Sequence, residues 1–301
     1  MAICLSNEKV QKSKLCLKKW GISGDQLIEI ADNALEIAKD SYEKGLALIM
    51  KENFEEAELE FNNSIRLNPE KSEYYIHRGN ARAAQNKIEF ACKDYSKVIK
   101  MYPNHAFAWA NKAAALVQLG KYKEALEASK KAIDLEPKHA SAWANKAAAL
   151  VQLGKYEEAL EASKKAIDLE PRHFAAWNNK GSALVYLRKY KEALEASEKA
   201  IDLDPRRSEA WNIKAYALVP LNKCDEALEA SKKAVELAPK DPVAWANKTC
   251  ALVCLERYEE ALEASRTAKD LDPRLEAILD AGLAHLAMLI KKKKETRESI
   301  A

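Results

Sequence analysis

The stretch AWANKAAALVQLGKY occupies residues 108–122 and recurs without change at residues 142–156. Alanine and leucine favour helix, and the glycine near the end predicts where that helix stops. The stretch carries only two charged residues, Lys112 and Lys121, in a chain that is 32% charged. One side of this helix must pack in a core, and the other side carries neither large apolar side chains nor charges.

The step that separates the two copies runs through most of the chain. Proline recurs with it at Pro69, Pro103, Pro137, Pro171, Pro205, Pro239 and Pro273, and tryptophan at Trp109, Trp143, Trp177, Trp211 and Trp245. Within residues 106–139, the apolar pattern predicts one helix over 106–119 and another over 122–135, which Glu136-Pro137 ends. A two-helix unit repeated seven times predicts a solenoid in which each unit buries its apolar face on its neighbours.

The period, the early tryptophan, the alanine in mid-unit and the closing proline resemble the tetratricopeptide repeat (TPR) family. The resemblance implies an all-α, right-handed superhelical solenoid whose first helices line a concave surface. The seven repeats are expected at 38–71, 72–105, 106–139, 140–173, 174–207, 208–241 and 242–275. Residues 1–37 are expected to form an N-terminal helical extension, and residues 276–301 a capping helix with a basic tail. The family pattern W-x2-L-G-x2-Y is altered at Lys112, Ala113 and Leu116, and Ser41 stands where tryptophan is usual.

Composition narrows the classes of function. The 301 residues include 49 basic and 46 acidic ones, a net charge of +3, which offers no clustered basic surface for nucleic acid. The N-terminus lacks the apolar core of a signal peptide, and no apolar run reaches the length of a membrane span. Six cysteines without a CxxC motif are interpreted as free thiols, which predicts a cytoplasmic protein.

Helical geometry places repeat positions 2, 6, 9 and 13, counted from the first residue of each repeat, opposite the tryptophan side. In the three repeats that span 106–207, these positions carry no charge. We call them the groove stripe, because the resemblance places them on the concave surface. The candidate peptide-binding residues are His77, Asn80, Phe107, Asn111, Gln118, Asn145, Gln152, Asn179, Tyr186, Tyr216 and Asn247.

Asparagine recurs at position 6 of four repeats, and its amide can pair with both the N–H and the C=O of a peptide bond. This row resembles the asparagine ladder of the O-linked N-acetylglucosamine transferases, which implies an extended peptide held by its backbone. The competing interpretation is that asparagine is habitual at this position in TPR units. Position 5 offers no lysine, so a clamp for a terminal carboxylate is not supported.

Other clusters have plainer interpretations. Position 7 is basic in every repeat, and its helical angle places the side-chain stems on apolar surface near the tryptophans. His105, His139 and His173 lie one repeat apart, too far from one another to share a metal ion. Cys250 and Cys254 are interpreted as small groove-lining residues. With no phosphate loop and no paired nucleophile and base, we expect no enzyme, no metal and no cofactor.

The sixth repeat is irregular, since Ile213 replaces asparagine, Tyr216 enters the stripe, and Pro220 predicts an early end of the first helix. These changes indicate either a specificity pocket or repeat decay. The expected function is a non-catalytic scaffold that binds an extended protein or peptide segment. The alternative is self-association into a homo-oligomer through the groove or through terminal segments such as the one with Leu15, Leu17 and Trp20. RNA binding would need a basic groove.

Overall fold

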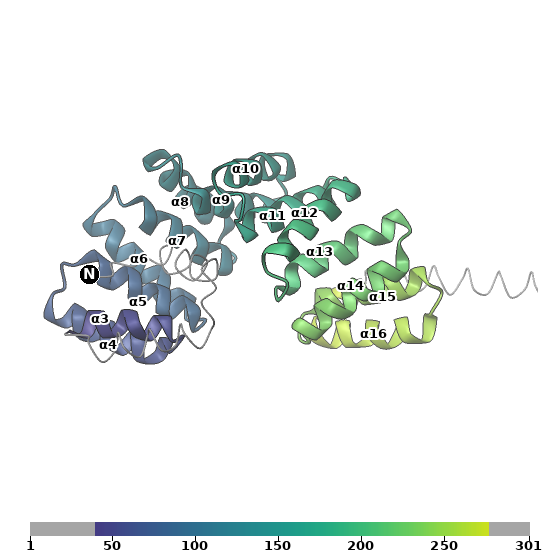
Figure 1. The fold of residues 1–301 in the computed structure, drawn as a ribbon, viewed down its shortest axis with the longest axis horizontal. Helices are drawn as coiled ribbons and strands as arrows, with labels where there is room; N and C mark the ends of the chain where they lie inside the picture. Colours follow the sequence, from purple (N-terminus) through teal and green to yellow (C-terminus); the bar gives the residue numbers. More distant parts are fainter. Residues whose placement is uncertain (1–39, 277–301) are drawn as a thin grey trace, which may run out of the picture. The chain divides into compact units, whose positions relative to one another are not determined.

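The computed structural model describes residues 40–276, which are drawn in colour in Figure 1. The described residues contain fourteen α-helices and no strand. The helices are α3 (Ser41–Met50), α4 (Phe54–Leu67), α5 (Ser72–Ala84), α6 (Ile88–Met101), α7 (Ala106–Gln118), α8 (Tyr122–Leu135), α9 (Ala140–Gln152), α10 (Tyr156–Leu169), α11 (Phe174–Tyr186), α12 (Tyr190–Leu203), α13 (Ser208–Leu218), α14 (Cys224–Leu237), α15 (Pro242–Cys254) and α16 (Tyr258–Leu271). The expected N-terminal extension and C-terminal capping helix lie outside the described residues.

The chain divides into two compact units, Met1–Ala149 and Leu150–Ala301, with the boundary inside α9. In the first unit, α3 to α8 each pack on the next helix along the chain, and in the second unit α10 to α16 do the same. First helices also meet one another, as α11 meets α13 and α13 meets α15. This packing confirms the predicted all-α solenoid of helix pairs.

A hydrogen bond explains why tryptophan and proline share one period. In the five repeats that carry tryptophan, the indole Nε1 donates to the carbonyl oxygen of the proline six residues earlier, over 2.8–2.9 Å. The basic residue three positions later stacks over the same indole, and Lys146 lies 4.8 Å from the ring centre of Trp143. The lysines at position 7 therefore lie along the tryptophan side, as their helical angle predicts.

The turn between the two helices of a repeat uses a left-handed residue at position 15. All seven such residues have φ between 58° and 73°: Glu52, Asn86, Gly120, Gly154, Arg188, Asn222 and Glu256. After α7, this geometry lets the amides of Gly120 and Lys121 donate to the carbonyls of Val117 and Leu116. These bonds cap the C-terminus of the helix, because its last carbonyl groups accept hydrogen bonds. Only two of the seven positions carry the glycine that this conformation favours.

The first helix of the sixth repeat ends early, as the sequence predicts. Helix α13 stops at Leu218, and Val219–Leu221 forms a short 3-10 helix, η1, that contains Pro220. Other first helices from α5 onward run 13 residues, whereas α13 runs 11. Proline has no N–H to donate and crowds the carbonyl four residues earlier, so the α-helix cannot continue through it.

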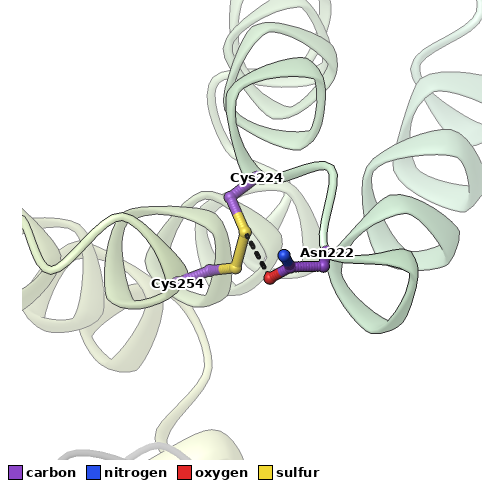
Figure 2. Close-up of a disulfide and its surroundings, with 3 residues drawn as sticks. All are labelled: Asn222, Cys224 and Cys254. Carbon is purple, nitrogen blue, oxygen red and sulfur yellow. Dashed lines mark hydrogen bonds between the residues drawn. A yellow bond between two sulfur atoms is a disulfide. The ribbon is translucent and has the colours of Figure 1, made fainter.

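The cysteine prediction is wrong for two residues. Cys224, at the start of α14, and Cys254, at the end of α15, form a disulfide (Figure 2). Their Cα atoms lie 5.8 Å apart although 30 residues separate them in the sequence. Spacing along the chain could not reveal the pair, because the packing of α14 on α15 brings the two ends together. Cys92 and Cys250 are free thiols in the described residues.

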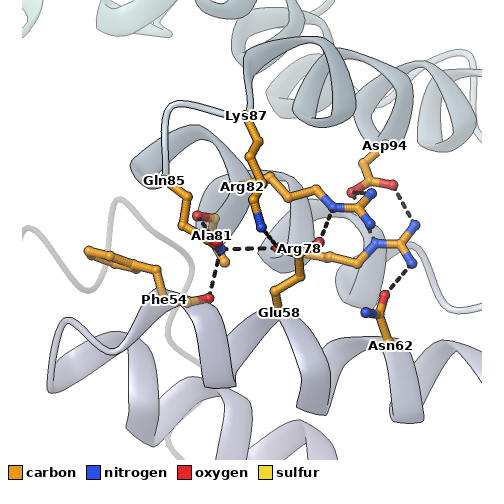
Figure 3. Close-up of polar contacts among 9 residues, drawn as sticks. All are labelled: Phe54, Glu58, Asn62, Arg78, Ala81, Arg82, Gln85, Lys87 and Asp94. Carbon is orange, nitrogen blue, oxygen red and sulfur yellow. Dashed lines mark hydrogen bonds and ion pairs between the residues drawn. The ribbon is translucent and has the colours of Figure 1, made fainter.

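The second repeat replaces an apolar contact by an ion-pair network (Figure 3). Later repeats have leucine at position 11 and alanine at position 23, whereas the second has Arg82 and Asp94. The Arg82 Nη1 lies 2.8 Å from an Asp94 carboxylate oxygen, and the Arg78 Nε donates to the same carboxylate over 3.0 Å. Glu58 accepts from Arg82 and pairs with Lys87, which ties α4 to α5 and to the start of α6.

Two arginines share one nearly buried carboxylate, and this arrangement gives a testable prediction. The Asp94 side chain is 4% exposed, so Asp94→Asn removes a negative charge that water cannot replace. We expect a loss of about 3 kcal/mol in the free energy of unfolding, measured by urea denaturation. The control is Glu161→Gln, which breaks an exposed pair with Lys164 and should leave stability unchanged. Equal effects of the two substitutions would contradict the role of the network.

The left-handed position predicts a substitution that stabilises. Arg188 is exposed and has a φ of 58°, which costs an L-residue about 1–2 kcal/mol. Arg188→Gly should raise the free energy of unfolding by about 0.5–1 kcal/mol after the greater freedom of glycine in the unfolded chain is subtracted. Glu195→Gly, at an exposed position inside α12, is the control and should lower stability by about 1 kcal/mol. A loss of stability in both variants would contradict the prediction.

Candidate functional site

In the first unit, the asparagines of the groove stripe tie successive first helices together. The Asn111 Nδ2 on α7 donates to the Asn80 Oδ1 on α5 over 3.1 Å. The Asn145 Nδ2 on α9 donates to the Ala110 carbonyl on α7 over 2.9 Å. Each bond uses one of the two N–H groups of the amide, so the second N–H and the Oδ1 remain for another partner. The asparagines thus have a structural function in addition to any contact with a ligand.

Two candidate residues on α5 lie inside the protein. The exposed fractions of His77 and Asn80 are 5% and 8%. Asn80 accepts a hydrogen bond of 2.8 Å from the Tyr95 hydroxyl as well as the bond from Asn111. His77 packs against the rings of Tyr42 and Phe61. Both residues position their neighbours, and neither presents its side chain to solvent.

Burial changes the acid–base chemistry of this region. The removal of water lowers the pKa of His77 to about 4, and the nearby Glu73 carboxylate opposes that shift only in part. The Nδ1 of His77 has no hydrogen-bond partner, so no acceptor at that atom favours the charged form. His77 is therefore neutral at pH 7.

In the second unit, two tyrosines are among the exposed residues of the groove stripe. Tyr186, at the end of α11, is 59% exposed, and its ring lies parallel to that of Tyr156 with 4.5 Å between the ring centres. Tyr216, on α13, is 49% exposed. Partial burial raises the pKa of Tyr216, and the neighbouring hydroxyls of Tyr190 and Tyr186 add to the effect. The Tyr216 hydroxyl is therefore neutral at pH 7 and can donate a hydrogen bond.

The last asparagine of the row is buried and paired. Asn247, on α15, is 5% exposed and donates from Nδ2 to the Asn212 carbonyl over 3.2 Å. The Asn212 side chain in turn donates to an Asp241 carboxylate oxygen over 2.7 Å. Ile213, which replaces asparagine in the sixth repeat, is also buried and lies close to Gly181.

The candidates thus fall into three groups by exposure. Gln118, Gln152, Tyr186 and Tyr216 are exposed, Phe107, Asn111, Asn145 and Asn179 are half-buried, and His77, Asn80 and Asn247 are buried. Sequence reasoning missed Tyr156, which supports Tyr186, and the Asn212–Asp241 pair, which supports Asn247. The constant spacing between position 17 of one repeat and position 13 of the next is the signal that could have identified the tyrosine pair.

Comparison with known proteins agrees with this geometry. Three sequence models, each described as a tetratricopeptide repeat, match residues 95–127, 116–179 and 178–242. The chain is a tetratricopeptide repeat protein. No match was found among curated protein sequences.

Solved structures show the same TPR fold. A chain of the APC/C hetero-tetramer Cut9-Hcn1 superposes with a TM-score of 0.73 and 19% identity, over 87% of this chain and 54% of that one. The TPR chain therefore spans about half the length of this structural relative. A tetratricopeptide repeat protein from Parabacteroides merdae superposes with a TM-score of 0.59 and 17% identity, over 86% of this chain and 98% of that one. TTC0263 from Thermus thermophilus superposes with a TM-score of 0.52 and 23% identity, over 61% of this chain and 100% of that one.

The family has a general class of function. TPR proteins generally mediate protein–protein interactions, and the fold is typically a non-catalytic scaffold. Each helix described between residues 40 and 276 is too short or too polar to cross a lipid bilayer.

The repeated histidines have a local structural function. His105 and His173 precede α7 and α11, and the Nδ1 of each accepts from the backbone amide three residues later over 3.3 Å. They are helix N-caps, a position that satisfies one of the free amides of the first turn. Within residues 40–276, no group of three or more histidine, cysteine or acidic side chains could hold a metal ion.

The depressed pKa of His77 predicts a pH dependence of stability. In the unfolded chain His77 binds a proton below about pH 6.5, whereas in the folded protein it does so only near pH 4. The contribution of neutral His77 to the free energy of unfolding is complete above pH 6.5. It is lost as the pH falls from 6.5 to 4, and the total loss is about 3 kcal/mol. His77→Asn, the residue of the later repeats, should remove this part of the slope in urea denaturation at pH 4 to 8. Identical slopes for the two proteins would contradict the assignment.

Proposed function

We propose that this TPR protein binds an extended, uncharged peptide segment on the groove stripe of its first helices. The observation that carries the proposal is the pair of exposed tyrosines, Tyr186 and Tyr216, on a stripe of the second unit. Leu169 and Leu262, two other large exposed side chains of this unit, lie on second helices, whereas Val243, 50% exposed at position 2 of the seventh repeat, also lies on the stripe.

The tyrosines suit this function for two physical reasons. Stacking on Tyr156 holds the ring of Tyr186 in place, so a ligand would not have to immobilise it. Each ring also combines a flat apolar face with a hydroxyl, which is why tyrosine is favoured at binding surfaces. The stripe of the repeats over 106–207 carries no charge, which suits a segment without charges, because a buried charge on the ligand would find no partner there.

Amide side chains support a grip on the peptide backbone. Asn111 and Asn145 are half-buried, and their bonds to α5 and α7 fix the orientation of the amides. Each keeps an N–H and an oxygen that could pair with a peptide group of the ligand. Gln118 is exposed on the same stripe of the first unit. Backbone pairing would make binding in this unit tolerant of ligand sequence, whereas the tyrosines of the second unit would select side chains.

The test is binding to a peptide array, followed by titration of captured peptides with the purified full chain. Tyr186→Ala combined with Tyr216→Ala should weaken binding about tenfold or more, because exposed aromatic anchors dominate such interfaces. Leu262→Ala is the matched control, since Leu262 is 45% exposed in the same unit but lies on a second helix. Asn111→Ala with Asn145→Ala tests the backbone grip separately, with helical content and melting measured alongside.

The outcomes discriminate between the candidate functions. Capture of peptides by the tyrosine variant with unchanged affinity would contradict the proposal. The self-association alternative would be favoured if neither the variants nor the unaltered chain capture peptides and if the molecular mass in solution rises with protein concentration. That alternative depends in part on Leu15, Leu17 and Trp20, which lie outside the described residues.

A further inference from the structure

The second unit brings three cysteines into two neighbouring helices. Cys224 opens α14, and Cys250 and Cys254 lie one turn apart on α15. Cys224 and Cys254 form the disulfide in Figure 2, whereas Cys250 is a free and exposed thiol. The bond joins the second helix of the sixth repeat to the first helix of the seventh.

The same two repeat positions are joined without a covalent bond elsewhere in this unit. Cys224 is at position 17 of its repeat and Cys254 at position 13 of the next, and Tyr156 and Tyr186 occupy the corresponding positions two repeats earlier. There the two side chains meet by ring stacking. The backbone of the repeat therefore brings these positions together by itself, and helix packing at the cysteine pair does not require the bond.

The two sulfurs differ in access and in local field. Cys254 is half-buried and Cys224 is 8% exposed, so a reductant reaches the sulfur of Cys254 more readily. Cys224 is the first residue of a 14-residue helix, where the free backbone amides stabilise a thiolate. Glu226 in the same turn is paired with Lys223 over 2.9 Å, which reduces its repulsion of a thiolate. Attack at Cys254 with Cys224 as the leaving group is thus the favoured direction.

We propose that Cys224 and Cys254 form a reversible redox site that exchanges with a dithiol reductant and with a low-molecular-weight disulfide oxidant. In the oxidised form, the bond clamps α14 to α15. In the reduced form, the two helices stay packed but the last repeat opens more easily. Cys254 occupies the groove stripe, so the redox state changes the end of that stripe in the second unit.

The exchange balances as two thiol–disulfide steps. One thiolate of the reductant attacks the Cys254 sulfur and forms a mixed disulfide, and Cys224 leaves as a thiolate that takes a proton from water. The second thiolate of the reductant then attacks its own sulfur in the mixed disulfide, which releases Cys254. The protein gains two electrons and two protons, and the reductant becomes a cyclic disulfide. Oxidised glutathione reverses the reaction and is reduced to two glutathione thiols.

The experiment uses the purified full chain in glutathione buffers of graded redox ratio, without denaturant. Free thiols are alkylated with one reagent, the disulfides are then fully reduced, and the thiols so released are alkylated with a second reagent. Mass spectrometry then shows which cysteines were free and which were oxidised. We expect Cys224 and Cys254 to change state together, while Cys92 and Cys250 stay reduced throughout. Dithiothreitol should lower the melting midpoint by about 5 °C and increase amide exchange in α14 and α15.

Two sets of variants serve as controls. Cys250→Ser and Cys92→Ser should keep the redox response of the unaltered chain. Cys224→Tyr combined with Cys254→Tyr recreates the stacked pair of the earlier repeats and should fold without any response to dithiothreitol. The proposal fails if Cys224 and Cys254 stay reduced in oxidised glutathione, if the bond yields only after unfolding, or if Cys250 replaces either cysteine as the partner.

Discussion

The bond between each tryptophan and the proline carbonyl six residues earlier is the interaction on which the regular repeats depend. It fixes how the first helix of a repeat leaves the turn that closes the preceding repeat. The proline supplies no N–H of its own, and its carbonyl at the end of the turn accepts from the indole. Because the donor and the acceptor both recur with the period of the repeat, every such junction has the same geometry. Identical junctions then bring identical helix positions into contact in the five repeats that carry tryptophan.

This constraint fixes the positions that meet but leaves their chemistry open. Positions 11 and 23 form a leucine–alanine contact in the later repeats and an Arg82–Asp94 ion pair in the second. In the first two repeats, glycine at position 8 leaves room for an aromatic ring at position 24, Gly45 for Phe61 and Gly79 for Tyr95. The later repeats have serine at position 24, and of these only the fifth keeps glycine at position 8. A Cβ at Gly45 would lie 2.7 Å from the Phe61 ring, so the phenylalanine requires the glycine.

The sequence predicts the fold well because the repeat displays the same signals seven times. The helix bounds of the unit over 106–139 and the early end of α13 at Pro220 follow from glycine and proline. The site is harder to predict, because its properties depend on exposure and pairing rather than on residue type. Asn111, Asn145 and Asn247 look equivalent in the sequence, yet Asn247 is buried and held by Asn212. The Cys224–Cys254 bond was missed for a related reason, since it links two helices whose contact only the solenoid creates.

Residues that depart from the repeat pattern have different surroundings in the two units. In the first unit the charged exchanges at Arg82 and Asp94 lie between helices, where they replace core contacts and remain shielded from solvent. In the second unit the exchanges reach the surface, as Tyr186, Tyr216 and Cys254 all lie on the groove stripe. A buried exchange can alter stability but cannot contact a ligand, whereas an exposed one on a rigid helix can do so at small entropic cost. The irregular sixth repeat and its neighbours are therefore where specificity is expected to reside, since the near-identical repeats over 106–173 carry no exposed aromatic side chain on the stripe.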